Sequence, residues 1–207
     1  MSYDIELRDP VTKEVLELPT AHVMVGGIYA ADYDPKTNTF LPRPIREAHL
    51  NITYNYARYY YAATDKDPRF AHDEISAYYA DGTTGPVVTE YGIRGIYGKS
   101  GAESINMLQD MIQKIKQQYK DAEGRWISTQ RTVRKFYDKK TGKELDYAKD
   151  IFRKRDEDSY VEKQETVTVW EGDTRNYWDE TAANAMRPLY QLLAMARLRP
   201  DGIWDGD

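Results

Sequence analysis

Tyr91-Gly92-Ile93-Arg94-Gly95-Ile96-Tyr97-Gly98-Lys99-Ser100-Gly101-Ala102-Glu103-Ser104 is the stretch around which this chain is organised. It holds the pattern Tyr-Gly-x-x-Gly twice in succession, at 91–95 and at 97–101. Repeated glycines are typical of a backbone that adopts positive φ or lies close to another segment. Ser100 and Glu103 then form a capping box, in which each side chain accepts a hydrogen bond from the other residue's N–H. The stretch predicts a glycine-rich loop followed by a helix.

A helix over 101–120 is also indicated by the spacing of the apolar residues. They recur every three or four positions, at Ile105, Leu108, Met111, Ile112, Ile115 and Tyr119. Lysines near the end of this segment suit the negative pole of a helix dipole. The segment is therefore expected to pack one face against the core.

The start of this helix is a candidate anion site, because a glycine-rich loop before a helix brings free N–H groups and the positive end of the dipole together. We predict that an anionic ligand such as a phosphate binds to Arg94, Tyr97, Gly98, Lys99, Ser100 and Gly101. The alternative is a tight turn whose capping box already uses the free donors. The loop is not a P-loop, since the first glycine of that motif would fall at Ile93.

The rest of the chain predicts an α+β fold with an antiparallel sheet packed by about four helices. Tyr3, Ile5 and Leu7 alternate with polar residues, and a turn before Val15–Leu18 indicates a β-hairpin. The other helices are expected near 55–64, 68–80 and 181–197. Asp67-Pro68 has the form of an N-cap followed by Pro at the first helical position.

The segment 121–173 is expected to be a charged, β-rich insertion. Residues 120–165 include 13 Lys or Arg and 11 Asp or Glu among 46 residues, which is typical of a solvated feature. Strand-like runs flank a turn at 139–142. We therefore predict a body formed by 1–120 and 174–207, with 121–173 as an inserted arm or subdomain.

The composition narrows the class of protein. The 207 residues include no cysteine, which excludes disulfides, a thiol nucleophile and zinc–thiolate sites. The net charge of −5 argues against a general nucleic-acid binder. Tyrosine is abundant, with 18 residues, and suits interfaces, ligand pockets or a polar core. No apolar run reaches the length of a membrane span and no signal peptide is evident, so we expect a cytoplasmic protein without a membrane partner.

Three blocks of the sequence resemble an uncharacterised family of bacteriophage and prophage proteins. They are residues 51–56, 92–104 and 184–207, the last ending in Leu-Arg-Pro-Asp-Gly-Ile-Trp-Asp-Gly-Asp. The resemblance implies a phage-borne protein acting in the host cell, and it supplies no catalytic residue. Small phage proteins are often inhibitors of host defence, which is an association rather than a mechanism.

Residues for catalysis are not evident. His72-Asp73-Glu74 could serve in acid–base chemistry or as metal ligands, but neighbours on the predicted helix point in different directions. The sequence therefore favours a non-enzymatic binding protein without catalytic residues, bound metal or cofactor. Its partner would be a host protein or an anionic small molecule such as a nucleotide, and self-association is compatible with the tyrosine content. The alternatives are a metal- or acid-dependent nucleotide hydrolase and a virion or assembly component.

Overall fold

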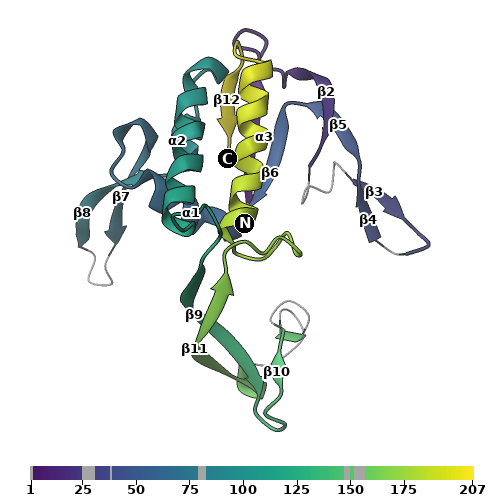
Figure 1. The fold of residues 1–207 in the computed structure, drawn as a ribbon, viewed down its shortest axis with the longest axis vertical. Helices are drawn as coiled ribbons and strands as arrows, with labels where there is room; N and C mark the ends of the chain where they lie inside the picture. Colours follow the sequence, from purple (N-terminus) through teal and green to yellow (C-terminus); the bar gives the residue numbers. More distant parts are fainter. Residues whose placement is uncertain (1, 25–30, 38, 79–82, 147–149, 152–156) are drawn as a thin grey trace.

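A three-stranded antiparallel sheet lies at the centre of the computed structural model (Figure 1). Strand β1 (Ser2–Arg8) is the middle strand and pairs with β12 (Ile203–Gly206) on one side and β6 (His49–Thr53) on the other. Tyr3, Ile5 and Leu7 are almost completely buried, as their alternation predicts. The structure describes residues 2–24, 31–37, 39–78, 83–146, 150–151 and 157–207.

The hairpin expected at the start of the chain forms only in part. A bridge joins Arg8 to Val15, and the Leu16 N–H donates to the Leu7 carbonyl oxygen over 2.8 Å. The chain then continues as β2 (Glu17–Val23), which pairs with β5 (Pro44–Glu47) instead of β1. Strand β1 therefore pairs mainly with β6 and β12, which lie far from it in the sequence.

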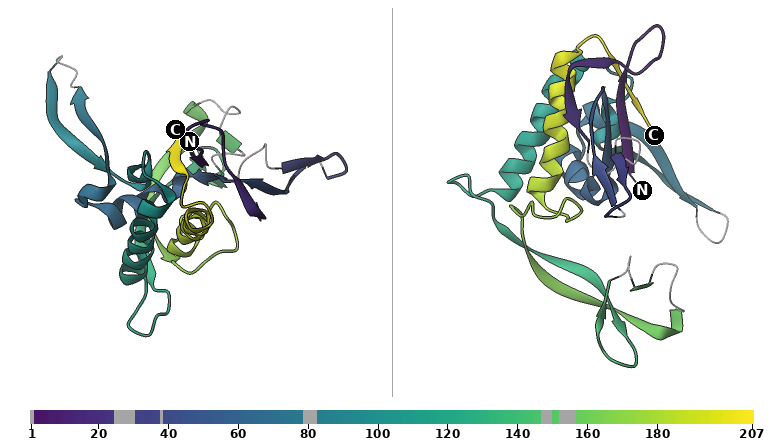
Figure 2. Two further views of the ribbon diagram at one scale, coloured as in Figure 1. Left: turned by 90° about the horizontal axis from the view of Figure 1, so that it is seen from above. Right: turned by 90° about the vertical axis from the view of Figure 1, so that its right-hand side faces the viewer.

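Two helices cover one face of the central sheet and run side by side (Figure 2). They are α2 (Gly101–Tyr119) and α3 (Ala182–Leu198), and they match the helices predicted at 101–120 and 181–197. The start of α2 is hydrogen-bonded to the segment that follows α3, so the two helices are antiparallel. Their shared apolar faces form the core, with Leu108, Ile112, Ile115, Leu189, Leu192 and Leu193 buried.

The helix predicted at 55–64 is also present, as a single 3-10 turn (Tyr54–Tyr56) followed by α1 (Ala57–Thr64). The helix predicted at 68–80 is wrong. Asp67 does cap a turn, since its Oδ1 accepts from the Arg69 N–H over 3.2 Å, but this turn covers only Pro68–Phe70. The chain then enters β7 (Ala71–Tyr78), while 79–82 lie outside the described residues.

Strand β7 has a partner strand, which the local sequence does not reveal. It pairs antiparallel with β8 (Thr84–Tyr91), which carries the β-branched run Val87, Val88 and Thr89. A local N-cap signal determines where a helical turn can begin, but non-local pairing determines whether the helix continues. The description of the fold therefore changes to three α helices in the described chain and several small antiparallel sheets.

The mixed-charge region forms an arm, built from β9 (Ser128–Asp138), β10 (Glu144–Leu145) and β11 (Tyr160–Trp170). Strands β9 and β11 pair over their whole length, from Ser128–Trp170 at the base to Asp138–Tyr160 at the tip. The β7–β8 hairpin and a hairpin of β3 (Ala31–Asp34) with β4 (Thr39–Pro42) also extend from the body (Figure 1). Among the described helices, none combines the length and apolar character that a bilayer crossing requires.

Candidate functional site

An open cleft of about 390 Å³ lies where three separate parts of the chain meet. We call it the 94–99 cleft, because Arg94, Gly95, Tyr97 and Lys99 of the glycine-rich loop form one wall. The start of β7 and the end of β12 supply the rest of the lining, with Ala71, His72, Asp73, Gly206 and Asp207. Three of the six predicted ligand residues, Arg94, Tyr97 and Lys99, therefore share one cavity.

Two of the glycines shape the loop for clear reasons. Gly98 has φ of 75°, in the left-handed region that favours glycine. A side chain at Gly101 would place its Cβ only 2.4 Å from the Arg199 carbonyl oxygen, so α2 could not begin so close to the end of α3. Gly98 is thus explained by its backbone conformation, and Gly101 by packing between α2 and the segment after α3, without a ligand.

The backbone part of the predicted anion site is wrong. The first N–H groups of α2 already have partners: Gly101 donates to Gly202 O over 2.8 Å and Ala102 donates to Pro200 O over 3.1 Å. The capping box is complete, since Ser100 N–H donates to Glu103 Oε2 over 2.7 Å and Glu103 N–H donates to Ser100 Oγ. These bonds from Ser100 also hold the pKa of Glu103 below its usual range. No N–H group of this helix start is left for a phosphate.

Arg94 and Tyr97 converge on the end of β12. Arg94 Nε donates to the Asp207 main-chain oxygen over 3.0 Å, and its guanidinium lies 5.4 Å from the centre of the Tyr3 ring. The Tyr97 hydroxyl donates to the same oxygen over 3.3 Å. Burial raises the pKa of Tyr97 to about 12, so the phenol remains a hydrogen-bond donor at neutral pH. The contacts to Asp207 could not be predicted, because nothing local indicates that the tail returns as a strand.

Lys99 differs from Arg94 in that no partner of its side-chain charge is found within ion-pair distance in the described chain. Its backbone is fixed, since the Trp204 N–H donates to Lys99 O over 2.9 Å. Its ammonium makes no ion pair within 4.0 Å in the part of the chain that the structure describes. A partly exposed ammonium on a fixed backbone, beside a cavity, is available to an anion.

The candidates His72, Asp73 and Glu74 lie on a strand rather than on the predicted helix. His72 and Asp73 line the 94–99 cleft, whereas Glu74 pairs across β8 with Thr89 and does not line it. The structure thus separates the third member of the trio from the other two. Acidic groups in the cleft come from β7 and β12, while the cations come from the glycine-rich loop.

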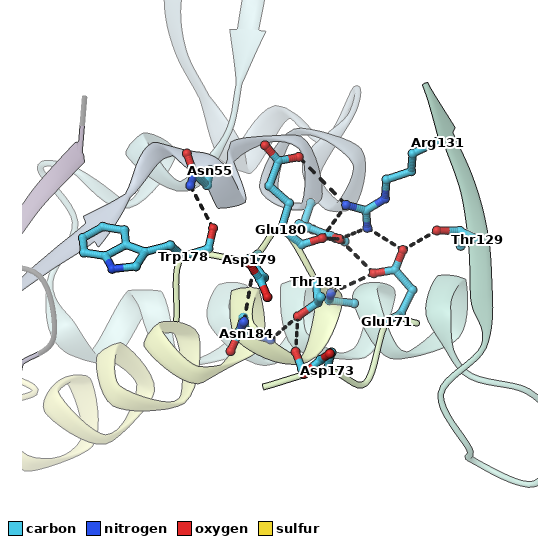
Figure 3. A network of polar contacts seen from close by, with 12 residues as sticks. Asn55, Thr129, Arg131, Glu171, Asp173, Trp178, Asp179, Glu180, Thr181 and Asn184 are labelled. Carbon is cyan, nitrogen blue, oxygen red and sulfur yellow. Dashed lines mark hydrogen bonds and ion pairs between the residues drawn. The ribbon is translucent and has the colours of Figure 1, made fainter. Parts of the chain in front are cut away.

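A second cavity, of about 550 Å³, lies at the base of the arm and is bordered by a buried network (Figure 3). The fully buried Glu171 carboxylate accepts hydrogen bonds from Thr129 Oγ1, Arg131 Nη2 and the Ala182 N–H, over 2.5, 2.5 and 2.9 Å. Arg131 also donates to the Tyr59 hydroxyl and the Glu180 carbonyl oxygen. Arg131 and Glu171 thus offset each other's charge, and the network joins the arm to α1 and α3. The buried Nε of Arg131 has no hydrogen-bond partner in the part of the chain that the structure describes.

The comparisons with known proteins give no relative: no family model matches the chain, and neither the curated proteins nor the solved structures include a match.

Proposed function

We propose that this protein is a non-enzymatic, phage-type binding protein that holds the anionic group of a small molecule, such as a nucleotide phosphate, in the 94–99 cleft. The observation that carries the proposal is the position of Lys99, a partly exposed ammonium without an ion pair in the described chain, beside this cavity. Arg94 adds a second charge and Tyr97 a protonated phenol from the same loop. The phage context comes from the resemblance of three sequence blocks, and inhibition of host defence is the role that such a protein would have.

The side chains, rather than the backbone, would bind the ligand. A phosphate oxygen within reach of Lys99 and Arg94 would gain two charge-assisted hydrogen bonds, each worth about 1.5–3 kcal/mol. The Tyr97 ring offers an aromatic surface against which a base or sugar could lie. Two other roles, nucleotide hydrolysis and virion assembly, stay predictions.

The test is calorimetric titration of linear and cyclic mono- and dinucleotides, in the presence of a metal chelator. We expect the wild-type chain to bind at least one of them. The Arg94→Ala, Lys99→Ala double variant should lose about 3–6 kcal/mol of binding free energy if both cations reach the ligand. The milder Lys99→Gln variant removes only a charge without an ion-pair partner in the described chain, so its fold should be unchanged.

The matched control is Lys139→Ala, Lys140→Ala, which removes the same charge from the exposed turn of the arm. This control should bind as the wild type does. Equal affinities for the wild type and the double variant, or absence of heat with every nucleotide, would reject the proposal.

A further inference from the structure

A β-bulge at the start of β7 brings three metal-binding side chains together. Ala71 pairs with Tyr91 and Asp73 pairs with Glu90, so two residues advance on β7 while one advances on β8. His72 is the extra residue of this bulge. In a regular strand, His72 and Asp73 would point to opposite faces, but a bulge redirects a side chain and removes that restriction. One nitrogen of His72 and one carboxylate oxygen each of Asp73 and Glu90 lie within 4.8 Å of one another.

The His72 ring is held in the orientation that a metal ligand needs. Its side chain is only 8% exposed, and Nδ1 lies 3.3 Å from the Phe70 backbone carbonyl oxygen. A carbonyl oxygen can only accept, so Nδ1 carries the proton and Nε2 of the neutral ring presents its lone pair. A metal-bound histidine is usually oriented in this way, by a hydrogen bond from the ring nitrogen that does not bind the metal to a backbone carbonyl oxygen or a carboxylate.

Nε2 of His72 points toward Glu90 without bonding to it. The distance from Nε2 to Glu90 Oε2 is 3.8 Å, which is too long for a hydrogen bond. In a tetrahedral zinc site with bonds of about 2.0–2.2 Å, two ligand atoms lie about 3.3–3.6 Å apart, so a small movement of the Glu90 side chain would bring this pair to the required spacing. The exposed Asp73 side chain can move by the small amount needed to bring the third atom to the same spacing.

We infer that His72, Asp73 and Glu90 form a binding site for one divalent cation of the zinc type. One imidazole and two carboxylates make a mixed nitrogen and oxygen site, which suits zinc better than a hard cation such as Mg²⁺. The cation would also offset the repulsion between Asp73 and Glu90, which are direct cross-strand partners of like charge. With three protein ligands, a further coordination position stays open for water or another ligand.

The test is calorimetric titration of Zn²⁺ alone into the full chain after removal of metal with a chelator, with Mg²⁺ titrated in parallel. We expect one Zn²⁺ per chain, with much weaker binding of Mg²⁺. His72→Ala and Glu90→Gln should each weaken zinc binding by at least about 10- to 100-fold, the loss typical of changes around a metal site. Glu90→Gln keeps the size of the side chain, so it remains informative if His72→Ala does not fold.

Two matched controls distinguish this site from adventitious zinc binding. Glu74→Gln changes the same chemical group as Glu90→Gln, on the strand that carries His72 and Asp73 but outside the cluster, and His22→Ala removes a histidine of β2. Both should bind zinc as the wild type does. Absence of stoichiometric zinc binding, or unchanged binding in both His72→Ala and Glu90→Gln, would overturn the inference. The nucleotide titrations are made without free metal, so either proposal can fail independently of the other.

Discussion

At the scale of single residues, the charge pattern of the chain does not predict that Arg131 and Glu171 form a buried ion pair. Both belong to the segment expected to be a solvated arm, yet their side chains are 5% and 0% exposed. Burial alone would raise the pKa of Glu171, but hydrogen bonds from Thr129, Arg131, the Ala182 N–H and Tyr59 together hold it below the usual range of a glutamate. The carboxylate is therefore charged at neutral pH and stabilises the folded chain.

Glu171→Gln should lower the free energy of unfolding at neutral pH by about 3–5 kcal/mol, because it leaves the buried Arg131 without its counter-charge. The folded-state pKa of Glu171 lies below the unfolded value of about 4.3, so the unfolded chain binds more protons between these two values. The contribution of Glu171 is complete above the unfolded pKa and is lost as the pH falls through the folded pKa. Denaturant unfolding at neutral and at acidic pH should therefore show the difference from wild type narrowing at acidic pH.

The control is Glu162→Gln, which removes a partly exposed carboxylate of the same arm. Its unfolding free energy should stay within about 0.5 kcal/mol of the wild type. A Glu171→Gln variant as stable as this control would show that the pair does not hold the arm to the body.

At the scale of elements, the packing of α2 against α3 follows from periodicity. The apolar residues of the predicted helix lie on the buried face as expected, except that Ile105 and Tyr119 are only partly buried at the edge of the core. Helix α3 begins at Ala182 and contains Pro188 in its interior. Pro188 is one of the buried residues of this helix, and the helix continues past it to Leu198.

Leu192→Ala should destabilise the protein by about 2–5 kcal/mol, since this fully buried side chain would leave a cavity between α3 and its neighbours. Thermal or urea unfolding measures the effect. Leu198→Ala in the same helix is the control, because that side chain is 43% exposed and its loss should cost far less. Equal destabilisation by the two substitutions would mean that the packing of α3 differs from the structure.

At the scale of the whole molecule, the arm is separate from the body along most of its length but not at its base. The predicted division at 121 and 173 would remove Arg131 and Glu171 together, although both are buried against the body. The register of β9 and β11 offers a better place to shorten the arm, since Val133 and Glu165 are direct cross-strand partners.

Replacing residues 134–164 by Asn-Gly should leave a folded body, because this dipeptide favours the tight turn that closes an antiparallel pair. The shortened chain should unfold within a few degrees of the wild type in a thermal melt. Replacing all of 121–173 by a flexible linker should instead lower the melting temperature strongly or prevent folding. If the shortened chain also fails to fold or melts at a much lower temperature, the arm is part of the core along its whole length.

The sequence alone determined the features that depend on neighbours within a few positions. The capping box at Ser100 and Glu103, the helices near 55–64, 101–120 and 181–197, and the alternating strand at the start are all read from local spacing. The clustering of Arg94, Tyr97 and Lys99 beside one cavity also follows from their shared loop. Local backbone preferences and apolar periodicity are sufficient for such features, because their hydrogen bonds and buried faces lie within one segment.

Only the tertiary structure decided the features that depend on a distant partner. Strand pairing with β8 converted the predicted helix after Pro68 into β7, and β6 took most of the edge of β1 that a hairpin would have used. The pairing of β7 with β8 placed Glu90, rather than Glu74, beside His72 and Asp73. Strand register has a meaning only between two segments, and the carbonyl groups after α3 satisfied the N–H donors that local sequence left free. The candidate sites of this protein therefore depend on contacts between segments that lie far apart in the sequence.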